Sequence, residues 1–130
     1  MYSMKKTDYG FRLVFGDFME GAEMGKWVEE ARAALESAPK EFFVFVDMRT
    51  LKPLPRDAQE KMEEGQKLFK AKGMLRSVVI LNNTMTKIQF KRIAQETGIY
   101  AWERYIDAST SEDWEKKGLD WLLRSVDPDS

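Results

Sequence analysis

The chain has 130 residues, of which 43% are apolar and 33% charged, and its formal net charge is −1. These values predict one soluble globular domain, and they exclude a strong overall field that would attract nucleic acid or anionic lipid. Histidine and cysteine are both absent. The chain therefore lacks a histidine general base, a thiol nucleophile and the commonest transition-metal ligands, and we expect no metal and no cofactor.

The sequence shows no pattern that would direct the chain to a membrane. Two lysines near the start are not followed by an apolar stretch, and the longest uninterrupted apolar run covers residues 42–46. This run is too short to cross a bilayer, and the first residues do not match a signal peptide. We expect a cytoplasmic protein without integral membrane association.

The first half of the chain predicts two strands with a helix between them. Residues 10–18 alternate as a strand does, and a further pairing segment precedes them at residues 2–6. Residues 23–40 place apolar side chains at helical spacing until Pro39 ends the helix. Residues 42–46 are apolar on both faces, which is typical of a central strand covered by helices on each side.

The second half of the chain continues the alternation. Apolar spacing predicts a helix, a strand, a helix, a strand and a last helix, over residues 57–73, 76–82, 86–98, 100–107 and 111–126. Thr86 and Gln89 predict a capping box for the middle helix, and Gly73 and Gly98 each end a helix. Strands that alternate with helices favour parallel neighbours joined by crossovers. We predict a single α/β sheet of four to five strands with about four helices.

The chain is predicted to form one domain. No linker, internal repeat or low-complexity segment interrupts the order of elements. We therefore assign residues 1–130 to a single domain and expect its ends, residues 1–8 and 127–130, to fray.

Four stretches carry a resemblance to a known family: "FRLVFG", "FFVFVDMRTL", "GMLRSVVILNN" and "DWLL". The chain resembles the STAS domain of bacterial anti-sigma-factor antagonists, and more narrowly the stand-alone STAS-like proteins of bacteria. The resemblance implies a STAS-like mixed sheet and a regulatory role. It also implies that Asp47 matches the family's aspartate at the end of a strand, and that the phosphorylatable serine falls near Asp57. This turn has no serine and Thr50 is its nearest hydroxyl, so we expect no phosphorylation switch.

A carboxylate at the start of the second helix is the central prediction for the site. Unpaired amides and the helix dipole attract negative charge at this point. We interpret Asp57, with Glu60 as its reciprocal partner, as an N-cap worth about 1 kcal/mol. The same carboxylate is also interpreted as a permanent mimic of a phosphoserine.

Polar residues also follow two of the predicted strands. In open α/β sheets, ligands bind beyond the carboxyl ends of strands, close to helix N-termini. Such residues could hold a phosphate or a carboxylate, although Asn and Thr are also favoured in turns because they bond to nearby backbone. No catalytic or metal-binding residue is predicted, and the predicted binding residues are Asp47, Arg49, Thr50, Arg56, Asp57, Asn82, Asn83 and Thr84.

We interpret the chain as a non-enzymatic STAS-like module that binds a protein, a small anionic or apolar ligand or a second copy of itself, but not nucleic acid. Two alternatives stay open. A groove rich in Met and Phe would accept a lipid or another apolar molecule, and some relatives of this group resemble lipid-transfer domains. A carboxylate-based hydrolase would use Asp47 and Asp57, the acidic pair predicted to lie closest together.

Overall fold

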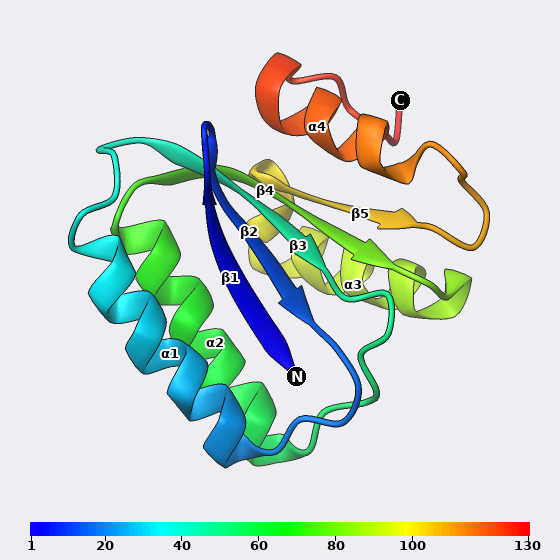
Figure 1. The fold of residues 1–130 in the computed structure, drawn as a ribbon. Coiled ribbons are helices and arrows are strands. Elements are labelled where there is room, and N and C mark those ends of the chain that lie inside the picture. Colours follow the sequence, from blue (N-terminus) through cyan, green and yellow to red (C-terminus); the bar gives the residue numbers. More distant parts are fainter.

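The computed structural model describes residues 1–130 as one five-stranded sheet with helices on both faces (Figure 1). β1 is antiparallel to β2, and all the other neighbouring strands are parallel. In the order in which they lie in the sheet, the strands are β1 (Tyr2–Thr7), β2 (Gly10–Phe15), β3 (Phe42–Asp47), β4 (Met74–Leu81) and β5 (Glu103–Asp107). The predicted single α/β sheet is confirmed, and the strand that is apolar on both faces, β3, lies in its centre.

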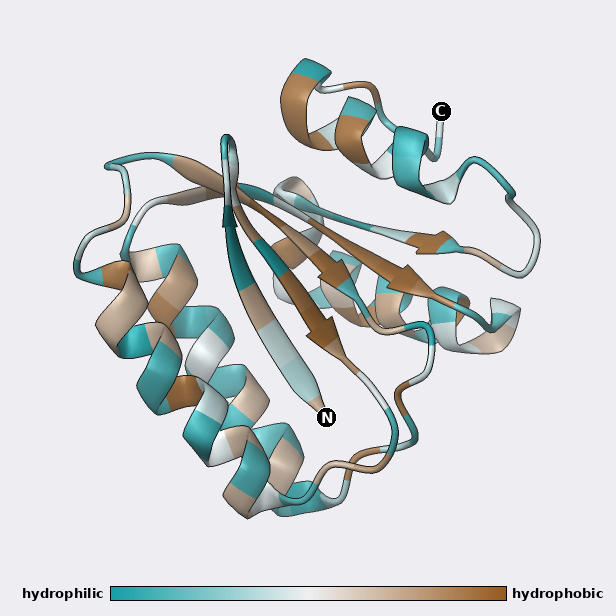
Figure 2. Cartoon of the chain, viewed as in Figure 1, coloured by the Kyte–Doolittle hydropathy of each residue, from teal (hydrophilic) through white to brown (hydrophobic).

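The helices form one layer on each face of the sheet. They are α1 (Gly21–Leu35), α2 (Arg56–Ala71), α3 (Thr84–Thr97), the short 3-10 helix η1 (Ile99–Ala101) and α4 (Trp114–Arg124). α1, α2 and α3 pack on one face, and α4 packs on the other. Figure 1 shows α1 and α2 side by side, with α4 across the sheet from them. In Figure 2 the hydrophobic colour runs along β2, β3 and β4, between the two layers.

The larger core lies between the sheet and the α1–α2 pair. Trp27 of α1 is 1% exposed, and its ring centroid lies 4.8 Å from that of Phe15 and 5.9 Å from that of Phe69. Gly65 of α2 leaves the space for this ring, because a Cβ at that position would lie 2.2 Å from Cζ3 of Trp27. Full burial of a large apolar side chain stabilises a fold by about 1.5–3 kcal/mol, so this cluster holds the two helices firmly on the sheet.

The smaller core lies under α4. Trp121 and Leu122 are buried there, and Trp121 donates its indole N–H to the carbonyl oxygen of Ser77 at 2.9 Å. The sheet side of this cluster consists of Phe45, Val78, Ile80 and Ile106. The predicted inward orientation of Trp121 is therefore confirmed, and its polar N–H finds a partner, as is usual for a buried indole.

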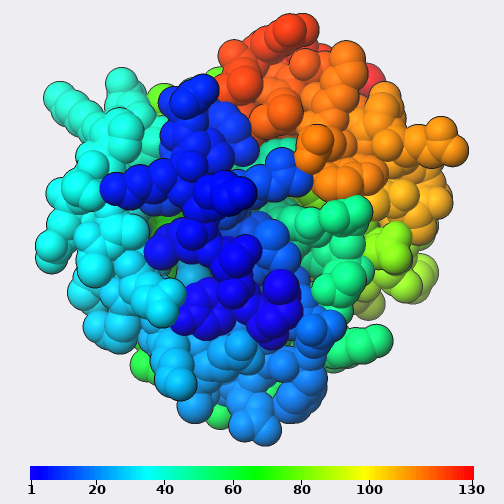
Figure 3. Space-filling view, in the orientation of Figure 1, coloured from blue at the N-terminus to red at the C-terminus, as the bar shows by residue number.

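The ends of the chain take part in the fold, which differs from the fraying predicted for residues 1–8 and 127–130. β1 pairs with β2 along its whole length, and Figure 3 shows its residues, in dark blue, lying on the visible face. At the other end, Asp127 forms an ion pair with Arg104, and Asp129 lies near Lys91. Cross-strand hydrogen bonds hold the backbone of the first segment, whereas the last segment is attached through the side chains of Asp127 and Asp129.

The start of α3 lies earlier than the sequence predicts. Asn83 is the N-cap, and its side-chain oxygen accepts a hydrogen bond from the Thr86 amide at 2.9 Å. The predicted capping box of Thr86 and Gln89 is therefore wrong, because a preceding asparagine already satisfies that amide. The predicted end is confirmed, since Gly98 follows α3 with a φ of 86°.

Candidate functional site

The carboxyl ends of β3, β4 and β5 meet at one edge of the sheet, because these strands are parallel. β3 ends at Asp47, β5 ends at Asp107, and β4 is followed directly by Asn82 and Asn83. The predicted site is at this edge. The structure brings together only part of the predicted set of residues here.

Asp47 and Arg49 form a closed pair after β3. The Asp47 carboxylate accepts hydrogen bonds from the Arg49 amide at 3.0 Å and from its Nε and Nη2 atoms at 3.0 and 2.9 Å. Burial raises the pKa of Asp47, but the hydrogen bonds and positive charge of Arg49 outweigh the burial, and the pKa lies below its ordinary value. The guanidinium also lies 4.1 Å from the centre of the Trp114 ring. The two charges therefore satisfy each other and hold the loop against α4.

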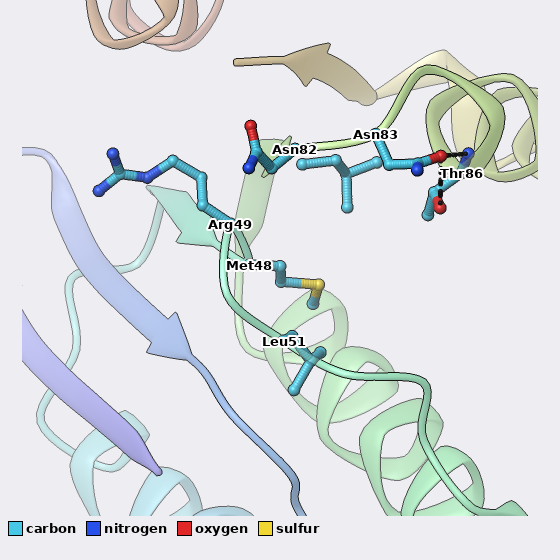
Figure 4. Close-up of a pocket in the computed structure, with 7 residues that line it drawn as sticks. Met48, Arg49, Leu51, Asn82, Asn83 and Thr86 are labelled. Atoms are coloured by element: carbon cyan, nitrogen blue, oxygen red, sulfur yellow. Dashed lines mark hydrogen bonds between the residues drawn. The ribbon is translucent and has the colours of Figure 1, made fainter. Parts of the chain in front are cut away.

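A shallow cleft of about 130 Å³ lies between the loops that follow β3 and β4 (Figure 4). Its lining residues are Met48, Arg49, Leu51, Leu81, Asn82, Asn83 and Thr86. Figure 4 shows Asn82 and Asn83 at one side of the cleft, while the guanidinium of Arg49 points away from Asn83 and Thr86. The cleft therefore presents amides and apolar side chains, and its one positive charge is directed elsewhere.

Asp107 is a buried carboxylate at this edge that sequence reasoning missed. It is 2% exposed, and it accepts hydrogen bonds from Thr84 Oγ1 at 2.6 Å, Ser109 Oγ at 2.6 Å and the Ser109 amide at 2.9 Å. Burial raises the pKa of Asp107, but these hydrogen bonds outweigh it and bring the pKa below its ordinary value. Thr84, one of the predicted site residues, therefore uses its hydroxyl to connect the start of α3 to β5. The Asp-x-Ser spacing after a strand is the signal that would have revealed this turn.

Asp57 lies at the start of α2, but not as its cap. The N-cap is Pro55 and the helix begins at Arg56, so Asp57 is the second residue of the helix. Its carboxylate accepts a hydrogen bond from the Ala58 amide at 2.8 Å. It also lies against the start of α1, because a Cβ at Gly21 would be 2.3 Å from Asp57 Oδ2. The predicted carboxylate therefore lies at the N-terminus of α2 and close to the N-terminus of α1. Each helix N-terminus favours negative charge.

The reciprocal partner predicted for Asp57 is wrong. Glu60 forms an ion pair with Arg56 at 3.5 Å on the surface, and the Arg56 side chain is 92% exposed. With Pro55 as the N-cap, the third helical position is Ala58 rather than Glu60, and no side chain caps this helix. Neither Arg56 nor Asp57 lines the cleft.

Thr50 also lies outside the cleft. Its carbonyl oxygen accepts a hydrogen bond from the Asp17 amide at 3.0 Å, and its hydroxyl faces Gly16. Of the eight predicted residues, the structure therefore brings Arg49, Asn82 and Asn83 into one cleft. The others serve local contacts or lie at the start of α2.

The acidic side chains predicted or found near this edge each have their own local partners. Asp47 is paired with Arg49, Asp107 is held by hydroxyl and amide donors, and Asp57 lies at the start of α2. No group of three or more Asp, Glu, His or Cys side chains could hold a metal ion. These three carboxylates therefore do not face one common cavity, as the predicted hydrolytic pair would have to do.

The outer surface of α3 is the second feature that sequence reasoning missed. Of its fourteen residues only Ala94 is buried, although the helix carries several large apolar side chains. The exposed ones, which we call the α3 patch, are Met85 (64% exposed), Ile88 (56%), Phe90 (37%) and Ile93 (51%). The patch adjoins the cleft, since Asn83 caps α3 and Thr86 lies in its first turn. Exposed apolar surface of this kind marks sites of interaction.

The structure is an α/β fold with one mixed five-stranded sheet of the SpoIIAA-like, or STAS-like, type. A solved structure of an uncharacterized protein of the DUF3478 family, with a SpoIIAA-like fold, from Shewanella loihica PV-4 matches this chain with a TM-score of 0.66 and 14% sequence identity. The match covers 95% of this chain and 93% of the other. No family model matches the sequence, and neither does any curated protein. The predicted STAS-like fold is thereby confirmed, and the likeness concerns the fold alone.

No helix of the chain combines the length and the apolar character that crossing a membrane demands.

Proposed function

We propose that this chain is a non-enzymatic regulatory binding module, and that the α3 patch with the adjoining cleft is its docking surface. The occupant is a segment of another protein that presents apolar side chains bordered by acidic ones. The observation that carries the proposal is the exposure of four large apolar side chains on a single helix of fourteen residues.

The apolar character of the patch supports a protein partner. Met85, Ile88 and Ile93 are each more than half exposed, so that their burial on docking would remove apolar surface from water. Protein interfaces combine such an apolar centre with polar groups at the rim. Here the amides of Asn82 and Asn83 border the patch at the end that adjoins the cleft.

The charge of α3 supports an acidic rim on the partner. The helix contains Lys87, Lys91 and Arg92 but only one acidic residue, Glu96, whereas the whole chain has a net charge of −1. A second copy of the chain fits less well. A two-fold axis near the middle of α3 would bring the basic residues of one helix close to those of the other.

A membrane surface and an enclosed lipid fit less well than a protein. Gln89, Arg92 and Glu96 follow Met85 along the same helical stripe and interrupt the apolar surface, whereas helices that lie in a bilayer interface separate the two faces sharply. Sites for small molecules usually enclose about 300–1,000 Å³, and the cleft offers about 130 Å³.

A site-directed cross-link tests this proposal. A photoreactive phenylalanine analogue replaces Ile88 in the patch or, as a matched control, Leu123, which is 49% exposed on α4. We expect position 88 to cross-link a protein in the cells that produce this chain, and position 123 not to do so. The cross-linked protein is then identified, purified and titrated calorimetrically against the wild type, Ile88→Gln with Met85→Gln, and Leu123→Gln.

The expected result is a loss of affinity of at least tenfold for the double variant and no change for Leu123→Gln. Equal affinities for all three chains overturn the assigned surface. Cross-links only between two copies of the chain, or only to lipid, overturn the assigned partner. Sedimentation with anionic vesicles serves to distinguish lipid from protein.

A further inference from the structure

A second cluster of charges lies away from the cleft, where the segment that follows α4 returns to β5 and α3. Arg104 of β5, Tyr100 of η1, and Lys87 and Lys91 of α3 converge there on two carboxylates. Arg104 Nε and Nη2 donate to the Asp127 carboxylate at 2.9 and 3.2 Å. The Tyr100 hydroxyl donates to Asp129, and the Lys91 and Lys87 ammonium groups lie 3.5 and 3.9 Å from the same carboxylate.

The cationic side of this cluster is built into the fold. The Arg104 side chain is 10% exposed, and its guanidinium carbon lies 3.7 Å from the centre of the Tyr100 ring and 4.3 Å from that of Trp121. Its Nη1 atom donates to the carbonyl oxygens of Tyr100 and Glu103. The guanidinium is therefore fixed in position, with Nε and Nη2 directed at the acceptor.

The anionic side is held much less firmly. The segment 125–130, which we call the tail, forms no helix or strand, and Ser125 and Val126 are exposed. The backbone hydrogen bonds of residues 127–130 stay within that segment. The tail is thus attached from residue 127 onward chiefly through the carboxylates of Asp127 and Asp129.

The groups that face the tail require an anion. Three positive charges and a phenol would remain if the tail moved away, and a guanidinium that is largely buried is costly to leave without a partner. Burial and the hydrogen bond to Asp129 raise the pKa of Tyr100 to about 12, so the phenol remains a donor at neutral pH. The two carboxylates of the tail supply a charge of −2, which matches the charge of about −1.5 to −2 on a phosphomonoester at neutral pH.

We infer that Lys87, Lys91, Tyr100 and Arg104 form a binding site for a phosphate dianion, free or as a phosphomonoester, which Asp127 and Asp129 of the tail occupy in this structure. Arginine binds phosphate through two parallel N–H donors, as it binds the Asp127 carboxylate here. The site includes none of the four apolar side chains of the α3 patch, although Lys87 and Lys91 also contribute to the basic charge of α3. The inference does not depend on the proposed docking surface.

The test uses the full chain with Asp127→Asn and Asp129→Asn, which keeps the shape of the tail and removes its charge. The probes are inorganic phosphate and glycerol phosphate, titrated by calorimetry. We expect the double variant to bind at least one of them ten times more tightly than the wild type. A preference for the ester assigns the site to phosphomonoesters, and equal binding assigns it to phosphate itself.

Two controls separate this site from an effect of net charge. Asp113→Asn with Asp120→Asn removes the same charge from the N-cap and the surface of α4, where these residues pair with Lys117 and Lys116. This control should bind phosphate as weakly as the wild type. Adding Lys87→Gln and Lys91→Gln to the tail variant should abolish the gain in affinity.

Equal phosphate binding by the tail variant and the α4 control overturns the inference. Binding of the peptide Asp-Pro-Asp-Ser without binding of phosphate overturns the assigned ligand class. If the double variant does not fold, Asp129→Asn alone is used, because it keeps the Arg104–Asp127 pair and frees Tyr100 and both lysines. The single variant should still gain affinity over the wild type, and no gain overturns the inference.

Discussion

Two helical regions cover the same face of the sheet in very different ways. The α1–α2 pair buries side chains along its whole length, among them Met24, Trp27, Val28 and Phe69. α3 is of similar length and also contains large apolar side chains, yet it buries only Ala94. The comparison shows that apolar residues on a helix need not belong to the core. In the first region they hold the fold together, and in the second most of them stay exposed to solvent.

The largest expected effect tests the first region directly. Trp27→Ala removes a ring that is 1% exposed between Phe15 and Phe69, and it should lower the free energy of unfolding by about 3–5 kcal/mol in urea denaturation. Phe90→Ala in α3 should cost less than about 1.5 kcal/mol, since that side chain is 37% exposed. An equal or larger loss for Phe90→Ala would contradict the comparison.

Trp27→Phe serves as a matched control for the larger substitution. The Trp27 indole N–H has no hydrogen-bond partner, so its removal leaves no polar group unpaired. Trp27→Phe should therefore cost clearly less than Trp27→Ala. A similar loss for both variants would show that the indole, rather than a large ring, is required.

A smaller effect is expected at the contact between α1 and α2. Gly65→Ala places a methyl group 2.2 Å from the Trp27 ring and should cost about 1–3 kcal/mol in thermal or urea unfolding. Gly25→Ala, on the neighbouring helix, would place its Cβ 3.9 Å from Lys61, which is an ordinary contact. It should stabilise the fold by about 0.5–1 kcal/mol through helix propensity. Destabilisation by both variants to the same degree would refute the close packing inferred here.

The smallest effect concerns the attachment of α3. Thr84→Val removes a hydroxyl that donates to the buried Asp107 carboxylate and should cost about 1 kcal/mol at pH 7. The pKa of Asp107 is lowered from its ordinary value of 3.8, so the folded state favours the charged carboxylate. Its contribution is fully present above pH 3.8 and is lost as the pH falls through the lower, folded-state pKa. The difference between wild type and Thr84→Val should therefore shrink towards pH 3.

Thr97→Val is the control for this pH dependence. Its hydroxyl donates to the backbone carbonyl of Ile93 on the same helix, and no carboxylate is involved. The cost of Thr97→Val in urea denaturation should be the same at pH 7 and pH 3. A pH-dependent cost there, or a constant cost for Thr84→Val, would exclude Asp107 as the titrating anchor.

The arrangement of the elements could be predicted because it depends on local patterns. Apolar spacing and the glycines at 73 and 98 locate the helices, and the unbroken apolar run at 42–46 marks the central strand. Helix starts were harder to predict. A capping residue such as Asp57 competes with a nearby proline, and only the folded chain shows that Pro55 takes the cap.

The site could be predicted only in part, because it depends on which partners the fold brings together. Arg49 reads as a free cation until the turn folds it back on Asp47 two residues earlier. The exposure of the α3 patch likewise cannot be predicted from the spacing of apolar residues. That spacing shows where apolar side chains lie on a helix but not whether the fold covers them. Arg104 and Asp127 are distant in sequence, and their pairing follows from the path of the chain after α4.

The order of the strands in the sheet has a consequence for what this architecture can recognise. Since the strands run β1 to β5 in sequence and α1, α2 and α3 all lie on one face, the winding never reverses direction. Doubly wound proteins bind nucleotides in the crevice that opens where their winding reverses. A singly wound sheet has no such topological switch point. The carboxyl edge of this sheet therefore has no crevice made by a reversal of winding, and the cleft there is formed by side chains of the loops that follow β3 and β4.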